Sequence, residues 1–273
     1  SDGSIPWFAG GPWDAWNHAE SVMALAVMGE MDAAQAGLDF LQETQGSDGS
    51  WLGGYGNALP MDGPMRIARV AAPVLKDTNF IAYPAVAVWH GFRLTGDVAQ
   101  ARRRWPMVRA AIDFVLAQQH PDGDISWCAE AHGTGIDDAV LAGNASIYAS
   151  LGCALHLAGL MDEPQDAWRL ARGRLRRAVL CAPQRFDRAG QDRSGFAMDA
   201  YYPILTGLTP VASALARLET RVAPFVRPGL GCLCVMDQPW VTTAESCELA
   251  MAMLRLGRRA SAARLLDWQQ ETA

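Results

Sequence analysis

The sequence predicts an all-α domain: an α/α toroid (barrel) of five to six helical hairpins, with an inner and an outer ring of helices. One pattern recurs along the chain, in which an apolar helix ends at a glycine, a short turn follows and an amphipathic helix begins. The first helix of each pair is apolar nearly all round, which is typical of a helix buried on every side, whereas the second has one apolar face. We expect a single toroid domain over residues 1–273, which can lack a final hairpin.

The expected elements follow this pattern in chain order. Inner helices are expected at residues 16–28, 80–94, 144–158, 202–218 and 243–256. Outer helices are expected at residues 32–44, 98–119, 164–179 and 259–270, with a short fifth outer segment at 220–226. Gly29, Gly96 and Gly257 stand where a left-handed residue commonly ends a helix. The only candidate strand is the short stretch 233–236.

The connections between helices are unequal in length. Turns from inner to outer helices have a few residues, whereas the returns to inner helices are long: 46–77, 120–143, 183–198 and 227–242. Long ordered loops usually carry function. Because all of them lead to the N-terminal ends of inner helices, we expect them to cover one face of the ring and to hold the working site.

Composition excludes several classes of protein. The net charge of −6 argues against nucleic-acid binding, which usually shows a basic stripe. No apolar run is long enough to span a bilayer, and no secretory leader is recognised at Ser1. Six cysteines are too sparse for a disulfide scaffold, so a reducing cytoplasm fits best. We therefore expect a cytoplasmic protein without an integral membrane segment, whose partner is a small-molecule substrate.

No metal or other cofactor is expected. Cys232 and Cys234 form a pair without a further cysteine or histidine beside it. His18 and Glu20 are two residues apart, which on a helix points their side chains away from each other.

Two stretches carry a resemblance to known families. "LDFLQETQGSDGSW" (38–51) and "IDFVLAQQHPDGDISW" (112–127) resemble the Gln–Trp repeat of squalene–hopene cyclases and prenyltransferase-type toroids. The chain also resembles the glucoamylase-like glycoside hydrolases, in an opening Trp/Pro/Asp segment, a "WP.VR.A.DF" stretch at 105–114 and a "DG…W.E" stretch at 122–130, in that order. Both resemblances imply an α/α toroid. The Asp-x-Asp-Asp acid motif of the cyclases is missing, since "GIDDAV" lacks its first aspartate.

Carboxylates and aromatic residues gather where the inner helices begin. Aromatic faces stack on sugar rings while carboxylates, amides and imidazoles hydrogen-bond hydroxyl groups, so this mixture indicates a carbohydrate site. Asp77, Asp199 and Thr242 can also be simple helix caps, and His18 a packing residue. The candidate substrate-binding residues are Trp13, Asp14, Trp16, His18, Glu20, Asp77, Asn79, Tyr83, Trp127, His132, Asp199, Tyr201, Tyr202 and Trp240.

Three glutamates are the candidate catalytic residues. Glycoside hydrolysis needs one protonated and one ionised carboxyl group. The glucoamylase resemblance implies that Glu130, in a long loop after Trp127, is the acid, and partial burial there would raise its pKa. Glu245, with Glu248 as the substitute, would be the base near a helix N-terminus, where the dipole favours an ionised carboxylate. A base beyond residue 273, or one supplied by Asp77 or Asp199, would leave Glu245 structural.

Three functions remain open at this point. The first is a carbohydrate-active enzyme, most simply an inverting glycoside hydrolase. The second is an isoprenoid cyclase or prenyltransferase-like enzyme, and the third a non-catalytic ligand-binding toroid; epimerase or lyase chemistry is a smaller alternative. The unequal loop lengths predict that residues from distant hairpins lie around one cavity, because all of them are at or near the same end of inner helices: Trp16, Tyr83, Glu130, Tyr202 and Glu245.

Overall fold

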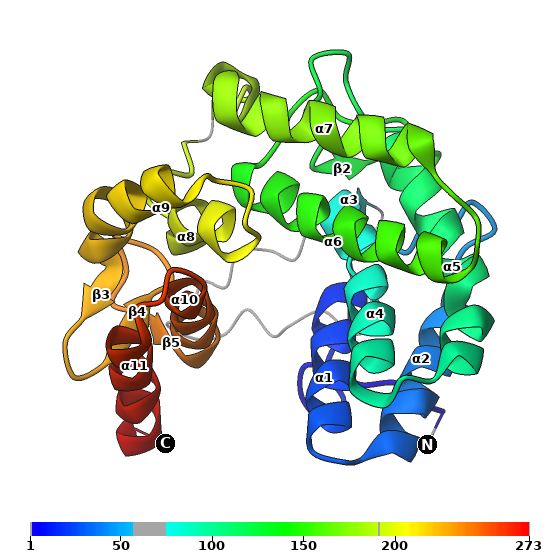
Figure 1. Cartoon of the computed structure of the whole chain (residues 1–273), viewed down its shortest axis with the longest axis horizontal. Helices are drawn as coiled ribbons and strands as arrows, with labels where there is room; N and C mark the ends of the chain where they lie inside the picture. Colours follow the sequence, from blue (N-terminus) through cyan, green and yellow to red (C-terminus); the bar gives the residue numbers. More distant parts are fainter. Residues whose placement is uncertain (1, 57–74, 191, 273) are drawn as a thin grey trace.

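The computed structural model describes residues 2–56, 75–190 and 192–272, and most of these residues are helical. Five helices follow one another along the inside of an arc: α1 (Ala15–Val27), α4 (Pro84–Thr95), α6 (Leu141–Leu160), α8 (Ala197–Leu205) and α10 (Thr243–Arg255). Each is followed by a helix further out: α2 (Met31–Thr44), α5 (Val98–Leu116), α7 (Asp166–Cys181), α9 (Val211–Arg217) and α11 (Arg259–Thr272). Figure 1 shows this succession of helical hairpins.

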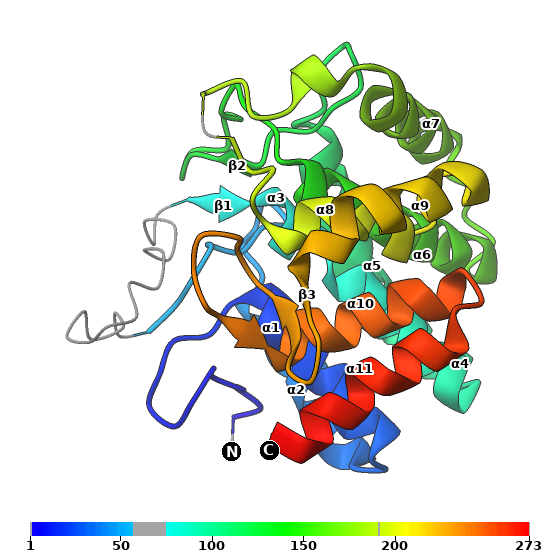
Figure 2. The same cartoon turned by 90° about the vertical axis from the view of Figure 1, so that its left-hand side faces the viewer.

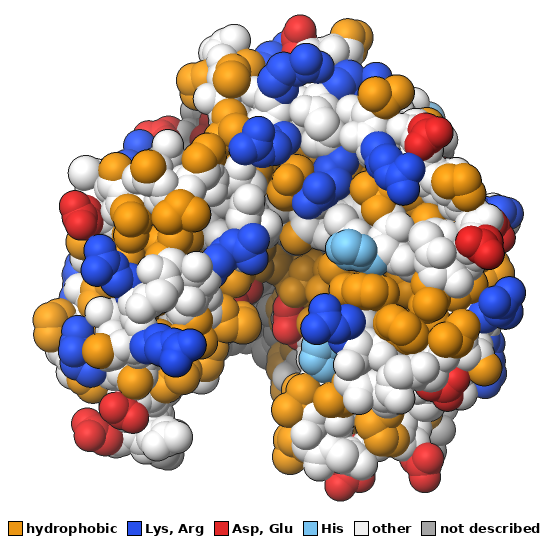
Figure 3. All heavy atoms as spheres, in the orientation of Figure 1, with side chains coloured by type: hydrophobic (Ala, Val, Ile, Leu, Met, Phe, Trp, Pro, Cys, Tyr) orange, Lys and Arg blue, Asp and Glu red, His pale blue; other side chains and the backbone are white. Residues whose placement is uncertain are grey.

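The inner helices contact one another in order, α1 with α4, α4 with α6, α6 with α8 and α8 with α10. Each also packs against the outer helix that follows it, so the buried core lies between the two layers. The two ends of the arc, α1–α2 and α10–α11, face each other across an opening in Figure 1. Figure 3 shows a notch there in the space-filling surface, with carboxylate groups visible inside it.

Two expected inner helices are interrupted. The stretch 80–94 divides into α3 (Thr78–Ala82) and α4, because Pro84 has no backbone N–H to continue the first segment. The expected helix at 202–218 is wrong: α8 ends at Leu205, and α9 begins after Pro210. Gly207 between them adopts a left-handed conformation with φ of 68°, which ends α8.

The expected fifth outer segment is longer than residues 220–226. It begins with α9 and continues through a π-helical turn, Leu218–Val222, and a 3₁₀ turn, Ala223–Phe225. Residues 211–218, assigned to an inner helix from sequence, therefore belong to the outer layer. The π-helical turn packs against α8, as an outer helix should.

Short strands occur only inside the long connections of the described residues. β1 (Lys76–Asp77) pairs antiparallel with β2 (Cys128–Ala129), so the loops of two successive hairpins are joined. β3 (Val226–Arg227), β4 (Gly231–Leu233) and β5 (Val241–Thr242) form a second antiparallel sheet. The candidate strand at 233–236 was thus placed about two residues too late. Figure 2 shows the long loops and strands together at one side of the molecule and the short turns at the other, as the loop lengths predict.

The two resembling stretches fold alike. Gln45 donates its side-chain N–H to the carbonyl oxygen of Gly49 at 2.9 Å and to that of Met107 in α5 at 3.0 Å. Gln119 repeats this geometry with the carbonyl of Gly123 at 2.9 Å and a carbonyl in α7 at 2.9 Å. Each glutamine thereby ties the end of its own outer helix to the next outer helix along the arc.

No helix in the described residues combines the length and the apolar composition needed to cross a membrane.

Candidate functional site

An aromatic cluster lies where several inner helices begin. Trp16 of α1 contacts Tyr83, between α3 and α4, with ring centroids 5.2 Å apart, and Tyr202 of α8 at 6.1 Å. Phe80 packs edge-on against the same indole at 5.4 Å. Three segments that are far apart in the sequence therefore meet at Trp16, and two of the five residues expected around one cavity lie against it.

Two carboxylates complete this cluster. Glu20 lies one helical turn after Trp16 on α1 and accepts a hydrogen bond from the hydroxyl of Tyr83. Glu248 on α10 accepts hydrogen bonds from Tyr202 at 2.5 Å and from Tyr201. The chain of contacts from Glu20 to Glu248 thus links the first and the last inner helix of the arc.

Burial controls the protonation of this cluster. It raises the pKa of Glu248 to about 7, and the nearby carboxylates of Glu20 and Glu245 contribute to the rise. The tyrosine hydroxyls act in the other direction, because they donate to the ionised form. Burial, reinforced by the adjacent carboxylates, also raises the pKa of Tyr83 and Tyr202 well above the usual value, so both hydroxyls remain protonated donors.

A cavity of about 180 Å³ adjoins the cluster on the loop side. Asp77 caps α3 with one carboxylate oxygen, Oδ1, which accepts hydrogen bonds from the backbone N–H groups of Asn79 and Phe80 at 2.9 and 3.1 Å. Burial raises the pKa of Asp77 to about 7 despite these bonds. The cavity is lined by Trp16, Asp77, Thr78, Asn79, Phe80, Trp127, Val140, Ala142, Gly143, Asn144 and Met198.

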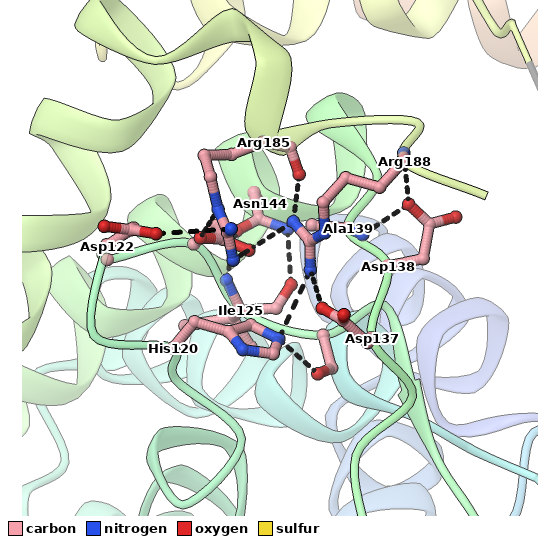
Figure 4. Close-up of polar contacts among 12 residues, drawn as sticks. His120, Asp122, Ile125, Asp137, Asp138, Ala139, Asn144, Arg185 and Arg188 are labelled. Atoms are coloured by element: carbon pink, nitrogen blue, oxygen red, sulfur yellow. Dashed lines mark hydrogen bonds and ion pairs between the residues drawn. The ribbon is translucent and has the colours of Figure 1, made fainter. Parts of the chain in front are cut away.

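An ion-pair network fixes the loop that carries Trp127. The fully buried carboxylate of Asp124 accepts hydrogen bonds from Arg185 at 2.8 Å and Arg188 at 2.8 Å, and Arg188 also binds Asp137 at 2.8 Å (Figure 4). Asn144 of α6 accepts a hydrogen bond from the backbone N–H of residue 125 at 2.8 Å. Two long loops are therefore joined to each other and to an inner helix beside the cavity.

Three candidate residues make contacts within the first hairpin and its N-terminal segment. His18 is fully buried on the face of α1 toward α2; its Nδ1 accepts from a backbone N–H, and its Nε2 donates to the carbonyl of Gly37 at 2.9 Å. Trp13 stacks on Tyr55 at 4.3 Å, beside this histidine. Asp14 caps α1 and binds side chains near the N-terminus. These three residues hold the first hairpin together and do not line the cavity.

Glu130 is not buried as expected. It follows β2 in a turn where its backbone N–H binds the carbonyl of Thr134 at 2.8 Å. Its side chain is 54% exposed, and its carboxylate lies 3.1 Å from Nε2 of His132, which is exposed as well. The turn projects outward because β2 is held against β1 only as far as Ala129. The structure therefore does not show the partial burial expected for the Glu130 side chain.

Three other candidates lie apart from the cavity. Asp199 is buried, and its carboxylate accepts a hydrogen bond from the N–H of Ala142 at 2.9 Å; it lines a different cavity, of about 420 Å³, between α7 and α9. Glu245 is buried in the first turn of α10, beside the thiol of Cys234. Trp240 pairs through its backbone carbonyl with the N–H of Cys234 at 2.8 Å. Of the two glutamates on α10, only Glu248 meets the aromatic cluster.

Several cavity residues were not among the candidates predicted from sequence. Phe80 and Met198 are next to the candidates Asn79 and Asp199, and Val140 is the residue before α6. The sequence indicates these three residues only through their position, because each lies at the start of an inner helix. Among the described residues no group of three or more histidines, cysteines, aspartates and glutamates could hold a metal ion. All six cysteines are free thiols.

No family model matches the chain. The chain is 43% identical, over 256 residues, to the MMP endo-(1,4)-3-O-methyl-α-D-mannosidase of Mycolicibacterium hassiacum. The match covers 93% of this chain and 67% of that protein. Such identity over most of both chains indicates a shared family and not merely a shared fold.

Solved structures are similar in fold at low sequence identity. A GH63 mannosylglycerate hydrolase from Thermus thermophilus, in complex with glucose, matches with a TM-score of 0.66 and 14% identity over 94% of this chain and 83% of its own. A rhamnosidase from Klebsiella oxytoca with rhamnose bound matches with a TM-score of 0.61 and 16% identity over 95% of this chain, which spans about half (49%) of that chain. A D-mannose isomerase matches with a TM-score of 0.64 and 11% identity over 94% and 73% of the two chains. These likenesses place the fold among the α/α-toroid type of the glycoside hydrolases.

Proposed function

Because the chain belongs to the family of the MMP endo-(1,4)-3-O-methyl-α-D-mannosidase and is a glycoside hydrolase, we propose that it cleaves internal α-(1,4) bonds of a polymer of O-methylated mannose. One observation supports this proposal above the others. An aromatic cluster with two carboxylates lies beside a cavity that is lined by a third carboxyl group, that of Asp77. The cluster consists of Trp16, Glu20, Tyr83, Tyr202 and Glu248. Stacking aromatic rings together with two kinds of carboxyl environment are what hydrolysis of a sugar polymer requires.

In this proposal Asp77 donates the proton to the leaving oxygen. It lines the cavity next to Trp127, and a pKa of about 7 keeps a large share of its carboxyl groups protonated at neutral pH. Its Oδ1 is used by the helix cap, which leaves Oδ2 for the substrate. Glu130, the acid that the glucoamylase resemblance implies, lies on the exposed rim and is the alternative donor.

Glu248 is the proposed base that activates water. It is preferred to Glu245 because its carboxylate lies in the aromatic cluster, where Tyr201 and Tyr202 donate hydrogen bonds that favour the ionised form. A water molecule between the donor and the base is expected to attack the anomeric carbon as the leaving oxygen takes the proton of Asp77. This arrangement inverts the configuration of the anomeric centre.

We also propose that the chain forms a toroid of five to six hairpins and that the protein is cytoplasmic. The solved structures of similar fold support the toroid, and the six free thiols agree with a reducing compartment.

The test compares hydrolysis of an α-(1,4)-linked 3-O-methylmannose oligosaccharide by the wild type, Asp77→Asn, Glu130→Gln and Glu248→Gln. Asp77→Asn and Glu248→Gln should each lower kcat by about 10²- to 10⁴-fold with the fold intact by circular dichroism. Glu219→Gln, an exposed position in the outer layer, is the matched control and should retain full activity.

Each outcome assigns a role. A loss in Glu130→Gln with an active Asp77→Asn would transfer the donor role to Glu130. Proton NMR of the first product should show the β anomer, and an α product would contradict inversion. A wild type that cleaves no mannoside, methylated or not, would overturn the proposed function.

A further inference from the structure

The walls of the 180 Å³ cavity are mostly apolar. Rings of Trp16, Phe80 and Trp127 face it together with the side chains of Val140 and Met198. Its volume is below that of sites for drug-sized ligands, roughly 300–1,000 Å³, so it suits one sugar residue and not an oligosaccharide.

Most polar groups at the cavity are already used by the protein. The hydroxyl of Thr78 donates to the carbonyl of Ser126 at 2.6 Å. The amide of Asn144 donates to the carbonyl of Ile125 at 2.9 Å and accepts from its N–H at 2.8 Å. These groups fix the loop and are not available to hydroxyl groups of a ligand.

Two acceptors remain within the described part of the chain. Asn79 is buried, and its Oδ1 has no hydrogen-bond partner there. The hydrogen bonds to Asp77 all involve Oδ1, so its Oδ2 is the second acceptor when the carboxyl group is ionised and a donor when it is protonated. The cavity can therefore pair with few hydroxyl groups, and most of its surface can only contact carbon.

A sugar that fits this apolar cavity wall must present few hydroxyl groups on the side that faces the wall. A hydroxyl group pressed against Trp, Val and Met side chains would lose its hydrogen bonds to water without replacement, which is costly. A methyl ether has no hydrogen to donate, and its methyl group gains from leaving water. The wall thus discriminates in favour of an O-methyl group at the position that faces it.

We infer that this cavity is the subsite that selects O-methylated mannose, with Val140, Gly143 and Met198 forming the contact surface for the methyl group. The inference rests on the proposed function and assigns its substrate preference to named residues. Oδ1 of Asn79 would accept a hydrogen bond from a free hydroxyl group of the same sugar, Oδ2 of Asp77 would face the leaving oxygen, and the tryptophans would pack against the C–H faces of the sugar.

The test is the selectivity, defined as the ratio of kcat/KM for an α-(1,4)-linked 3-O-methylmannose oligosaccharide to kcat/KM for the unmethylated oligosaccharide of the same length. The wild type should give a ratio of about 10 or more, since one methyl group in an apolar pocket changes discrimination by about 10- to 200-fold. Binding of both sugars to Asp77→Asn, measured by calorimetry, should show the same preference without turnover.

Two substitutions change the wall itself. In Gly143→Ala the added methyl group would lie 3.7 Å from Cβ of Asn79 and 3.8 Å from Cβ of Val140, which are ordinary contacts, so it fills cavity space without strain. Met198→Gln keeps the length of the side chain and makes it polar. Each should lower the selectivity about tenfold. Gly159→Ala on the same helix has no atom within 4 Å of the new methyl group and should leave the selectivity and activity unchanged.

A wild type that cleaves both oligosaccharides equally would overturn the inference while the proposed function stands. A wild-type preference that survives intact in both Gly143→Ala and Met198→Gln would overturn it too, by locating the selection elsewhere. If the wild type cleaves neither sugar, the proposed function fails, and equal binding of the two sugars by calorimetry would then reject the cavity assignment independently.

Discussion

Glu248 shows how a single buried residue makes stability depend on pH. Its carboxyl group has an ordinary pKa of 4.5, which burial raises to about 7 in the folded chain. Between these two values the folded protein holds a proton that the unfolded chain has released. Stability is therefore highest below pH 4.5 as far as this group is concerned, and it falls as the pH rises through 7.

At the residue scale, we predict that Glu248→Gln flattens this pH dependence. The rise of this pKa from 4.5 to about 7 corresponds to about 3 kcal/mol, so the wild type should lose up to that amount of unfolding free energy relative to the variant between pH 4.5 and 8. Urea unfolding at both pH values measures it. Parallel curves for the two proteins would contradict the raised pKa. Asp77 and Asp199, whose pKa values are raised to about 7 and 6, act in the same direction in both proteins and cancel in the difference.

At the element scale, the conformations of Gly49 and Gly123 explain why the similar stretches 38–51 and 112–127 both contain a glycine in the turn after the outer helix. Both have positive φ angles, 86° and 101°. A Cβ at Gly49 would lie 2.3 Å from the backbone oxygen of Ala110, and one at Gly123 would lie 2.5 Å from that of Arg174. The turn after each outer helix thus approaches the backbone of the next outer helix, and only glycine permits that distance.

Gly123→Ala should lower the free energy of unfolding by about 2 to 4 kcal/mol, because the new methyl group collides with a backbone atom and the φ angle is unfavourable for alanine. The matched control is Gly173→Ala on α7, next to Arg174, where a methyl group meets no atom within 4 Å. Its helical position should make the control neutral or slightly more stable. Similar thermal midpoints for the two variants would show that the turn can shift at little cost.

The repeated pattern was enough to predict the hairpins, since glycine ends and helical periodicity are local features. The break in the stretch 202–218 also has local signals, since Gly207 and Pro210 are residues that commonly end a helix, but the apolar pattern on both sides of them favoured one continuous inner helix. In the site, the four-residue spacing of Trp16 and Glu20 places both on one face of α1, whereas His18 between them turns toward α2. Assigning that face required knowing which side of the helix meets the next hairpin.

At the scale of the whole molecule, the long connections on one side of the arc are joined to one another; we call this side the loop face. β1 and β2 join the first long connection to the second. Arg188 and Arg185 join the second to the third through Asp124, whose side chain is fully buried, and Arg188 also pairs with Asp137 of the second connection (Figure 4). Their hydrogen bonds hold the pKa of Asp124 below its usual range. The cavity walls therefore come from segments that support one another.

Arg188→Ala should destabilise the protein by about 3 kcal/mol, since it removes a cation from a buried carboxylate that retains only Arg185. Hydrogen exchange should rise in residues 120–139, the loop that carries Trp127. Arg169→Ala serves as the control, because it breaks an exposed pair with Asp166 and should cost well below about 1 kcal/mol. Equal effects of the two substitutions would show that the network does not hold the loop face.

The order in which the inner helices contact one another also sets when the site can exist during synthesis. Each hairpin packs mainly on its neighbours in the sequence, so the arc can grow from its N-terminal end as the chain leaves the ribosome. Trp16 of α1 can meet Tyr202 only after α8 has been made, and Tyr202 can bind Glu248 only after α10 has been made. The aromatic cluster is therefore completed only with α10, so a nascent or truncated chain that stops before α10 would hold the earlier hairpins without the link from Glu20 to Glu248.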